Sequence, residues 1–382
     1  MYNKDSYSHY MKTIKQLLAD LVAFPTTEDN PEARREAMDY IEDILRKYLP
    51  HVQRYEWNGF ESLYAAPTKT KTPKVLLAAH VDVVVGQPEQ FKLVAKDGNL
   101  YGRGVSDMKF AVAGYLAMLN ELDDVSKYDF GILITSDEEI GGYNGVKKFV
   151  DDGYLPQIVV LPDGGGSWTL EQAAKGMIRP YFTARGIPMH GSRTWEGESA
   201  IEKMMNFLRQ VQYDLFPEQG PETNTFNVGR IEGGNVFNQI SDICTADVDI
   251  RPVDNTEAKR ILAKMDKIAR DNDVTYELLL NESAIQINLD DPLVKAFIAS
   301  VEKVLGRPIQ TMRGLAGSDA RHWAPHNIPT MVMYPESGEH HGDHEWLSEE
   351  ALHHFKDIVI DYLNAVALSP QTTPAKSLTS VQ

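Results

Sequence analysis

Side chains of the kinds that bind metal ions recur along the chain where a predicted strand ends or a glycine-rich turn begins. They are His80, Asp107, Glu139, Asp163 and His341. Binding and catalytic groups of α/β proteins lie outside the carboxyl ends of their strands. A set of imidazoles and carboxylates in such places can hold two metal ions that activate water. The sequence therefore predicts a two-metal hydrolytic site.

The segment KVLLAAHVD, residues 74–82, carries the strongest of these signals. An apolar run of strand type ends in His80 and Asp82, which are two residues apart. Because strand side chains alternate between faces, both point to the same side of the predicted sheet. A ligand imidazole needs a partner that fixes its tautomer. We interpret His80 as a metal ligand and Asp82 as the carboxylate that orients it.

Three consecutive acids stand in SDEEIGG, residues 136–142, between an apolar strand and a Gly-Gly turn. Such a run more often forms a solvated face, but its position after a buried strand argues for a site. A two-metal site needs one carboxylate as a ligand and another as a proton carrier. Glu138 and Glu139 can divide these two roles.

The remaining motifs are weaker when each is taken alone. Asp107 in YGRGVSDMK (101–109) could be an ordinary helix N-cap, and Asp163 in LPDGGG (161–166) could belong to a simple turn. The segment GEHHGDHE (338–345) packs three histidines together, of which at most one or two can be ligands. The order of the motifs and their shared position at strand ends make the set convincing.

Length and composition allow this interpretation. A chain of 382 residues exceeds what one hydrophobic core usually fills, so two domains are expected. The net charge of −17 argues against nucleic acid and an anionic membrane surface as partners. Cys244 is the only cysteine, which argues against an internal disulfide and a thiolate zinc site. The sequence has no signal core and no apolar run of membrane-spanning length, so a cytoplasmic enzyme is expected.

The elements that must position these residues alternate between strand and helix. Strand-like runs at 75–79, 130–135 and 158–161, with a helix at 110–122, indicate a mostly parallel sheet. The pattern then changes to half-buried alternating strands at 178–184, 224–231 and 243–250. Two amphipathic helices, at 199–213 and 256–272, separate them. This change predicts an inserted α+β module with an antiparallel sheet, because α/β character returns at 292–305 and 330–334.

Together, the HxD, GRGxxDMK, DEEIGG and PDGG segments resemble the M20 family of dinuclear-zinc metallopeptidases and amidohydrolases, which includes desuccinylases, deacetylases, carboxypeptidases and dipeptidases. The resemblance extends from the N-terminal helices to about Leu363. It implies an α/β catalytic domain with a mostly parallel mixed sheet in residues 1–177 and 286–368. Residues 178–285 would form an α+β lid and dimerisation domain with an antiparallel sheet, and residues 369–382 a disordered tail.

The resemblance also implies two Zn²⁺ per subunit, for which Co²⁺ or Mn²⁺ could substitute. One zinc would be held by His80, Asp107 and Asp163, and the other by Asp107, Glu139 and His341, with Asp107 bridging. The family spacing His-x-x-x-Glu, matched by His341 and Glu345, favours His341 over His340 and His344. Relatives have a cis peptide bond at the bridging aspartate, so a cis bond is expected between Asp107 and Met108.

The same resemblance implies catalytic and substrate-binding roles. Glu138 would be the general base, and His190 would reach from the lid into the active site of the neighbouring subunit. The alternative for His190 is an exposed lid residue without a catalytic role. Substrate contacts are expected from Asn235, Asn238, Arg251, Gly317 and Ser318. Arg251 could equally be a salt-bridge residue of the lid. The functional unit would be a homodimer formed through the lid.

Asp163 is an informative departure within this resemblance. Desuccinylase, deacetylase and carboxypeptidase branches have Glu at this position, whereas several aminopeptidase and dipeptidase branches have Asp. The difference favours a hydrolase of short peptides, with an N-acyl-amino-acid deacylase as the alternative. A non-catalytic member that binds such a ligand, or a scaffold whose dimer matters, would be expected to have lost Glu138 or a metal ligand. The sequence retains all of these residues.

Overall fold

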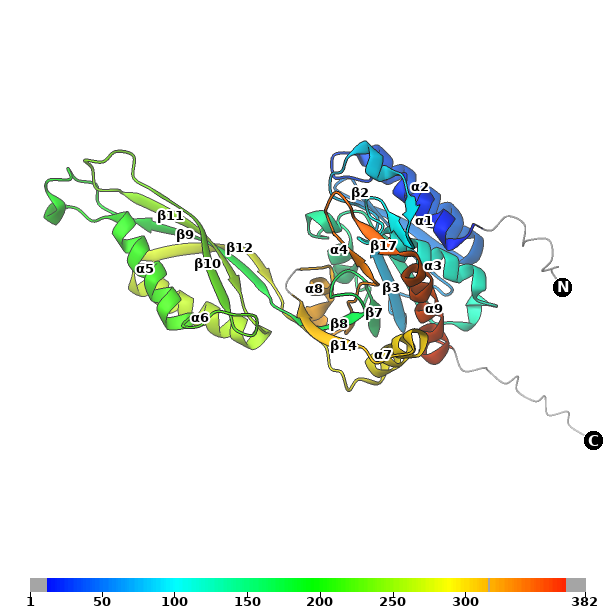
Figure 1. Ribbon diagram of the computed structural model, residues 1–382. Coiled ribbons are helices and arrows are strands. Elements are labelled where there is room, and N and C mark those ends of the chain that lie inside the picture. The colour runs from blue at the N-terminus through cyan, green and yellow to red at the C-terminus, as the bar shows by residue number, and fades with distance from the viewer. Residues whose placement is uncertain (1–11, 315–316, 369–382) are drawn as a thin grey trace, which may run out of the picture. The chain divides into compact units, whose positions relative to one another are not determined.

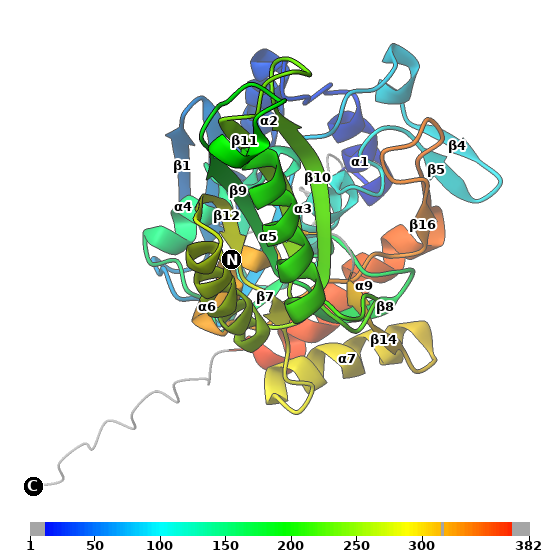
Figure 2. The ribbon, with the colours of Figure 1, turned by 90° about the vertical axis from the view of Figure 1, so that its left-hand side faces the viewer.

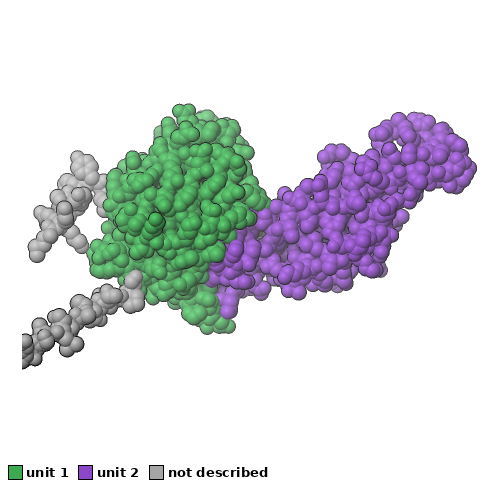
Figure 3. Space-filling view, turned by 180° about the vertical axis from the view of Figure 1, so that it is seen from behind, with its two compact units in different colours: residues 1–163, 290–309, 334–382 green, residues 164–289, 310–333 purple. Residues whose placement is uncertain are grey.

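The computed structural model describes residues 12–314 and 317–368, which fall into two compact units (Figure 3). Unit 1 contains the described residues of the ranges 1–163, 290–309 and 334–382, and unit 2 those of the ranges 164–289 and 310–333. The predicted domain boundaries at residues 178 and 285 stay predictions, because these units group residues by contact alone. The predicted disordered tail, residues 369–382, lies outside the described residues.

The central sheet of unit 1 contains the strands that the sequence predicted from apolar runs. Strands of this unit lie in the order β1-β2-β6-β3-β7. Their bounds are β1 His51–Trp57, β2 Phe60–Ala66, β3 Val75–His80, β6 Phe130–Thr135 and β7 Ile158–Val160. β3 pairs in parallel with β6 and β7, while β2 pairs antiparallel with β1 and β6. The sheet is therefore mixed, as predicted, although β1 and β2 were not identified from the sequence.

A small second sheet of unit 1 brings two loops together. Its strand order is β16-β17-β5-β4, with bounds β4 Val94–Lys96, β5 Asn99–Tyr101, β16 Ser337–Gly338 and β17 Trp346–Ser348. β5 leads into the loop of residues 102–108, and β17 follows the loop of residues 339–345. Because Trp346 of β17 pairs with Tyr101 of β5, these two loops lie side by side where they meet the sheet.

Helices pack against the strands of unit 1 (Figure 1). They are α1 Ile14–Val22, α2 Pro31–Tyr48, α3 Lys109–Glu121, α4 Val146–Asp151, α7 Pro292–Leu305 and α9 Glu349–Val366, with short 3₁₀ turns η2 Pro88–Phe91, η3 Val125–Lys127 and η4 Glu138–Ile140. The stretch of α3 from Lys109 to Leu119 is buried on all sides, in contact with β3, α1 and α9. A helix that is apolar all round belongs in such an interior position. α3 therefore anchors the loop that ends at Met108 to the centre of the unit.

Unit 2 contains the predicted α+β module. Its main sheet is antiparallel, in the order β10-β11-β9-β12, and the two amphipathic helices α5 and α6 pack against it (Figure 2). The bounds are β9 Met177–Arg185, α5 Ala200–Leu215, β10 Thr225–Gly233, β11 Ile243–Arg251, α6 Asn255–Asp271 and β12 Val274–Glu282. Phe182, Phe207 and Met265 are fully buried between the sheet and the helices. The predicted strands and helices of this module are confirmed, but β12 was missed.

The rest of unit 2 is a smaller sheet with short helical turns. The sheet has the order β13-β8-β14, with bounds β8 Thr169–Ala174, β13 Ile285–Gln286 and β14 Gln310–Gly314. The other elements are η5 Thr194–Glu196, α8 Ala320–Trp323, η6 Ala324–His326 and β15 Thr330–Met331. The strand predicted at 330–334 is thus shorter than expected. Within the described residues, no helix combines the length and the apolar character needed to cross a membrane.

Candidate active site and metal centre

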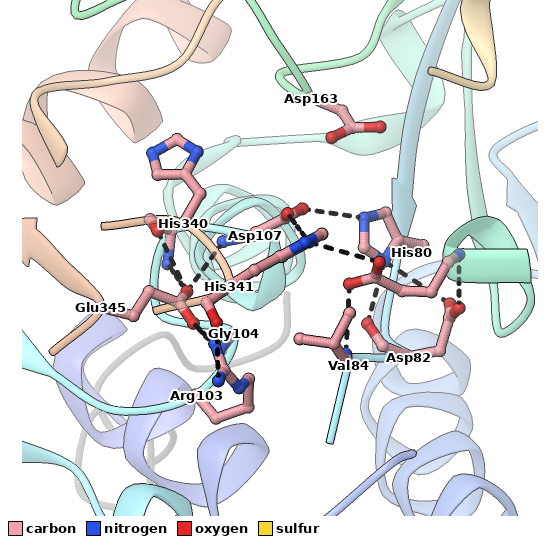
Figure 4. A network of polar contacts seen from close by, with 12 residues as sticks. His80, Asp82, Val84, Arg103, Gly104, Asp107, Asp163, His340, His341 and Glu345 are labelled. Carbon is pink, nitrogen blue, oxygen red and sulfur yellow. Dashed lines mark hydrogen bonds and ion pairs between the residues drawn. The ribbon is translucent and has the colours of Figure 1, made fainter. Parts of the chain in front are cut away.

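The carboxyl ends of neighbouring parallel strands in unit 1 carry a cluster of acidic and imidazole groups. His80 is the last residue of β3, Glu138 and Glu139 come just after β6, and Asp163 comes just after β7. Because β3 lies between β6 and β7 and runs parallel to both, these strand ends share one edge of the sheet. The topology brings together side chains that are far apart in the sequence (Figure 4).

Two groups of possible ligand atoms form within this cluster, each with its atoms within 4.8 Å of one another. One consists of His80, Glu138 and Asp163, and the other of Asp107, Glu139 and His341. Asp107 connects the two groups, because its Oδ1 lies 3.2 Å from Nε2 of His80 and its Oδ2 lies 3.0 Å from Nε2 of His341. All five residues predicted as ligands therefore lie in one cluster, together with Glu138.

Asp82 holds two parts of the cluster in place. The Nδ1–H of His80 donates to the main-chain oxygen of Asp82 at 3.0 Å, and the nearest carboxylate oxygen is at 3.5 Å. The other carboxylate oxygen of Asp82 accepts the main-chain N–H of Glu139 at 3.0 Å. Asp82 thus contacts the imidazole mainly through its main chain, while its side chain fixes the turn that carries Glu139.

Of the three neighbouring histidines, His341 is the one whose ring faces the acids. Its Nε2 lies 3.3 Å from Glu139 Oε2 as well as near Asp107. Hydrogen bonds with Asp107 and Glu139 raise the pKa of His341 to about 10. His340 instead packs against Tyr334, and burial lowers its pKa. His344 is exposed.

The pKa values of two buried acids in the cluster are shifted in opposite directions. Burial raises the pKa of Asp107, but hydrogen bonds with His341 and His80 outweigh it and hold that pKa far below its usual range. Burial, and next the charge of Asp107, raise the pKa of Asp163 to about 7. One oxygen of Asp163, Oδ2, is buried and has no hydrogen-bond partner among the described residues. This unpartnered oxygen, together with the neighbouring imidazole nitrogens and carboxylate oxygens, is a set of donors that fits a divalent transition metal.

Glu345 is a buried residue whose role the sequence did not indicate beyond its spacing from His341. Its carboxylate accepts hydrogen bonds from Arg103, from the main-chain N–H of Gly104 and Asp107, and from both the N–H and the hydroxyl of Ser106. Arg103 also donates to the main-chain oxygen of His341 at 3.3 Å. The Arg103–Glu345 pair therefore joins the loop that carries Asp107 to the loop that carries His341.

Two further residues near the cluster, Asp137 and Tyr334, were given no role by the sequence analysis. Asp137, the first of the three acids, accepts the main-chain N–H groups of Asn144 and Gly145 at 2.7 and 3.1 Å and so stabilises the turn after β6. Burial raises its pKa to about 6. The hydroxyl of Tyr334 donates to Asp163 Oδ1 at 3.0 Å. The peptide bond between Asp107 and Met108 is cis, which confirms the prediction.

The residues predicted to contact substrate, and His190, belong to unit 2. His190, Asn235 and Asn238 are exposed, and the Nδ1 of His190 lies 2.8 Å from the hydroxyl oxygen of Ser192. Main-chain hydrogen bonds join their two loops, Gly191 to Asn238 at 2.7 Å and Ile240 to Met189 at 2.9 Å. Arg251 donates to Asp249 at 2.6 and 3.1 Å, which is the salt bridge considered as its alternative role. Gly317 is exposed and Ser318 is buried.

Known proteins resemble this chain over most of its length. Residues 76–365 match the family model described as peptidase family M20/M25/M40. A probable succinyl-diaminopimelate desuccinylase from Staphylococcus aureus strain MRSA252 is 28% identical over 279 residues, which is 62% of this chain and 67% of that protein. A probable succinyl-diaminopimelate desuccinylase from Staphylococcus epidermidis strain ATCC 12228 is 24% identical over 321 residues, or 73% of this chain and 78% of that protein.

Solved structures with a similar fold include two peptidases. The aminopeptidase PepT from Bacillus cereus superposes with a TM-score of 0.74 at 20% identity, covering 92% of this chain and 97% of that chain. A tripeptidase from Staphylococcus aureus gives a TM-score of 0.72 at 20% identity, with coverage of 92% and 97%. At such identities the likeness concerns the fold, which is an α/β unit with a separate antiparallel module.

Proposed function

The chain belongs to peptidase family M20/M25/M40, and we propose that within this family of hydrolases it cleaves short peptides with the help of two zinc ions. The observation that carries the proposal is the position of Asp107, whose two oxygens face His80 and His341 in two different groups of potential ligands. A carboxylate in this position can bridge two cations.

In this proposal, His80, Asp107 and Asp163 hold one ion, and Asp107, Glu139 and His341 hold the other. Bound there, divalent ions would lower the pKa of a water molecule and polarise the carbonyl of the scissile amide. The hydrogen bond from His80 to the main chain of Asp82 supports this assignment, because it leaves Nε2 of His80 directed at Asp107. The main-chain contact of Glu139 with Asp82 similarly orients Glu139.

Glu138 is the proposed general base. It begins η4, next to Glu139, and one of its carboxylate oxygens lies within 4.8 Å of possible ligand atoms of His80 and Asp163. From this place its carboxylate can take a proton from the attacking water and pass it to the leaving amine. Glu138 could instead serve as a ligand, because it belongs to one of the two groups, and its replacement distinguishes these roles.

Unit 2 is proposed to act as a lid and as the interface of a homodimer, with His190 serving the site of the neighbouring subunit. β10 supports this, because among the described strands it pairs only with β11, and its residues from Asn227 to Gly233 are exposed. An open strand edge can pair with another chain. Asn235, Asn238, Arg251, Gly317 and Ser318 are the proposed substrate contacts. A cytoplasmic location stays a prediction from the sequence.

Hydrolysis of N-acyl amino acids is the second candidate function. The desuccinylase relatives favour it, whereas Asp163 and the peptidase folds favour short peptides. A panel of dipeptides and tripeptides, compared with N-acetyl and N-succinyl amino acids, separates the two. We expect the zinc-loaded protein to release amino acids from the peptides, and the same protein treated with a chelator to be inactive. Activity confined to the N-acyl substrates would establish the second candidate in place of the first.

A further inference from the structure

Tyr334 lies at the start of the segment that also carries His341 and Glu345. Its side chain is buried, and its hydroxyl donates to Oδ1 of Asp163 at 3.0 Å. The hydrogen bond therefore runs from the phenolic hydroxyl of Tyr334 to the carboxylate of Asp163.

His340 holds the ring of Tyr334. The two rings pack edge to face, with centroids 4.2 Å apart and planes at 85°. The hydroxyl of Ser337 lies 3.2 Å from Nε2 of His340 and also donates to the main-chain oxygen of Pro335 at 2.9 Å. Of the two adjacent histidines, His340 thus supports Tyr334 while His341 faces the acids.

The two carboxylate oxygens of Asp163 consequently differ in their hydrogen bonding. Oδ1 accepts the hydroxyl of Tyr334, whereas Oδ2 is buried without a hydrogen-bond partner among the described residues, in a carboxylate that belongs to the group with His80 and Glu138. We propose that Tyr334 is a positioning residue that reserves a single oxygen of Asp163 for the metal ion at His80. This inference rests on the proposed two-metal function.

A carboxylate restricted to one oxygen has a consequence for metal choice. Zn²⁺ prefers few ligands in tetrahedral geometry, whereas Mn²⁺ accepts octahedral oxygen-rich sites and so tolerates a carboxylate that binds through both oxygens. By donating a hydrogen bond to Oδ1, Tyr334 makes that oxygen the weaker ligand of the two, which favours Zn²⁺ over Mn²⁺ at the His80 position. Partners that orient a ligand typically contribute about 10–100-fold to metal affinity.

The test replaces the hydroxyl and keeps the ring. Tyr334→Phe is compared with Tyr362→Phe, which removes the hydroxyl of another buried tyrosine of unit 1, one that donates to the main-chain oxygen of Leu293 at 3.2 Å. The full-length proteins are stripped of metal and titrated with Zn²⁺ and, separately, with Mn²⁺ by calorimetry. We expect Tyr334→Phe to weaken one of the two Zn²⁺ binding steps by about 10–100-fold. The other step should be unchanged, and the preference for Zn²⁺ over Mn²⁺ at the weakened step should fall.

The control variant should match the wild type in both steps. The inference is overturned if Tyr334→Phe also matches the wild type. It is equally overturned if both steps weaken together while the metal-free variant melts at a lower temperature, since that is the signature of a general structural role. A wild-type protein that binds no second ion would overturn the proposed function instead, so the two failures are distinguishable.

Discussion

Unit 1 and unit 2 hold their candidate functional residues in opposite ways. Around Asp107, buried side chains form hydrogen bonds with one another and with the main chain. The carboxylate of Glu345 by itself accepts hydrogen bonds from several groups of the neighbouring loop. In unit 2, His190 and Asn238 are exposed, and Nδ1 of His190 forms its hydrogen bonds with the nearby Ser192. A buried, interlinked set has its geometry before a ligand arrives, whereas an exposed set acquires its geometry on binding. We infer that unit 1 supplies the chemistry and unit 2 the recognition.

Exposed apolar side chains strengthen this contrast. Phe237 is 101% exposed and Trp195 77%, and both lie on the two loops that main-chain hydrogen bonds join near His190. Exposed apolar groups that gather in one place commonly mark interaction surfaces. The comparison therefore predicts that changes in unit 1 affect turnover and metal affinity, while changes in unit 2, apart from His190, affect binding and assembly.

The largest effect is expected from Glu138→Gln. Loss of the proton carrier should reduce kcat by about 10²–10⁴-fold, a typical contribution of general acid–base catalysis. Both metal-binding steps should remain, because in the proposed mechanism Glu138 is not a ligand. Steady-state kinetics and calorimetric titration of the same preparation check this. Loss of a metal-binding step in the variant would instead assign Glu138 to the ligands.

Glu345→Gln tests how strongly the interlinked set of unit 1 is held. Glu345 and Arg103 are 1% and 3% exposed, so the change leaves a buried guanidinium without its counter-charge. Breaking one partner of a buried ion pair costs about 3–5 kcal/mol of folding free energy. Chemical denaturation measures this loss.

The matched control for that change is Glu349→Gln, which removes a partly exposed pair with Lys15. An exposed pair contributes about 0.2–1 kcal/mol, so the control should be nearly as stable as the wild type. Equal stability of the two variants would show that the Arg103–Glu345 pair does not hold the loops together.

The smallest effect is expected from mixing two inactive proteins, His190→Ala and Glu138→Gln. If His190 serves the site of the neighbouring subunit, a mixed dimer contains one site with both native residues. Part of the wild-type activity should then return after subunit exchange, as followed by a peptide hydrolysis assay. Proven exchange without any return of activity would rule out a role for His190 across the interface.

The parts of the site that lie on long, buried strands could be predicted from the sequence. β3 and β6 are continuous apolar runs, as strands covered on both faces are, and His80 and Glu139 follow from where those runs end. The short strands β4, β5, β16 and β17 have two or three residues each, too few for a periodic pattern. Local sequence patterns therefore did not indicate that the loops of Asp107 and His341 lie next to each other, and only the family resemblance placed these two residues in one site.

Contacts between segments that are far apart in the sequence could not be predicted either. Tyr334 and Asp163 are 171 positions apart in the sequence, and Arg103 and Glu345 are 242 apart. Local propensity and spacing do not encode such pairs, since each partner is an ordinary residue in its own segment. The choice of His341 rested on its spacing to Glu345, which is a local signal, whereas the hydrogen bonds of Glu345 join segments that are far apart in the sequence.

The free edge of β10 has a consequence for how the protein behaves in solution. A row of unpaired main-chain groups can template the growth of a continuous sheet through many molecules, which leads to aggregation. The register of β10 shifts between Val228 and Arg230, and Arg230 and Glu232 place an exposed ion pair on the same strand. A bulge and charges at an edge oppose stacking in long arrays. β10 therefore has an edge that can pair with one strand of a second subunit. The bulge and the charged side chains of the same strand discourage indefinite polymerisation.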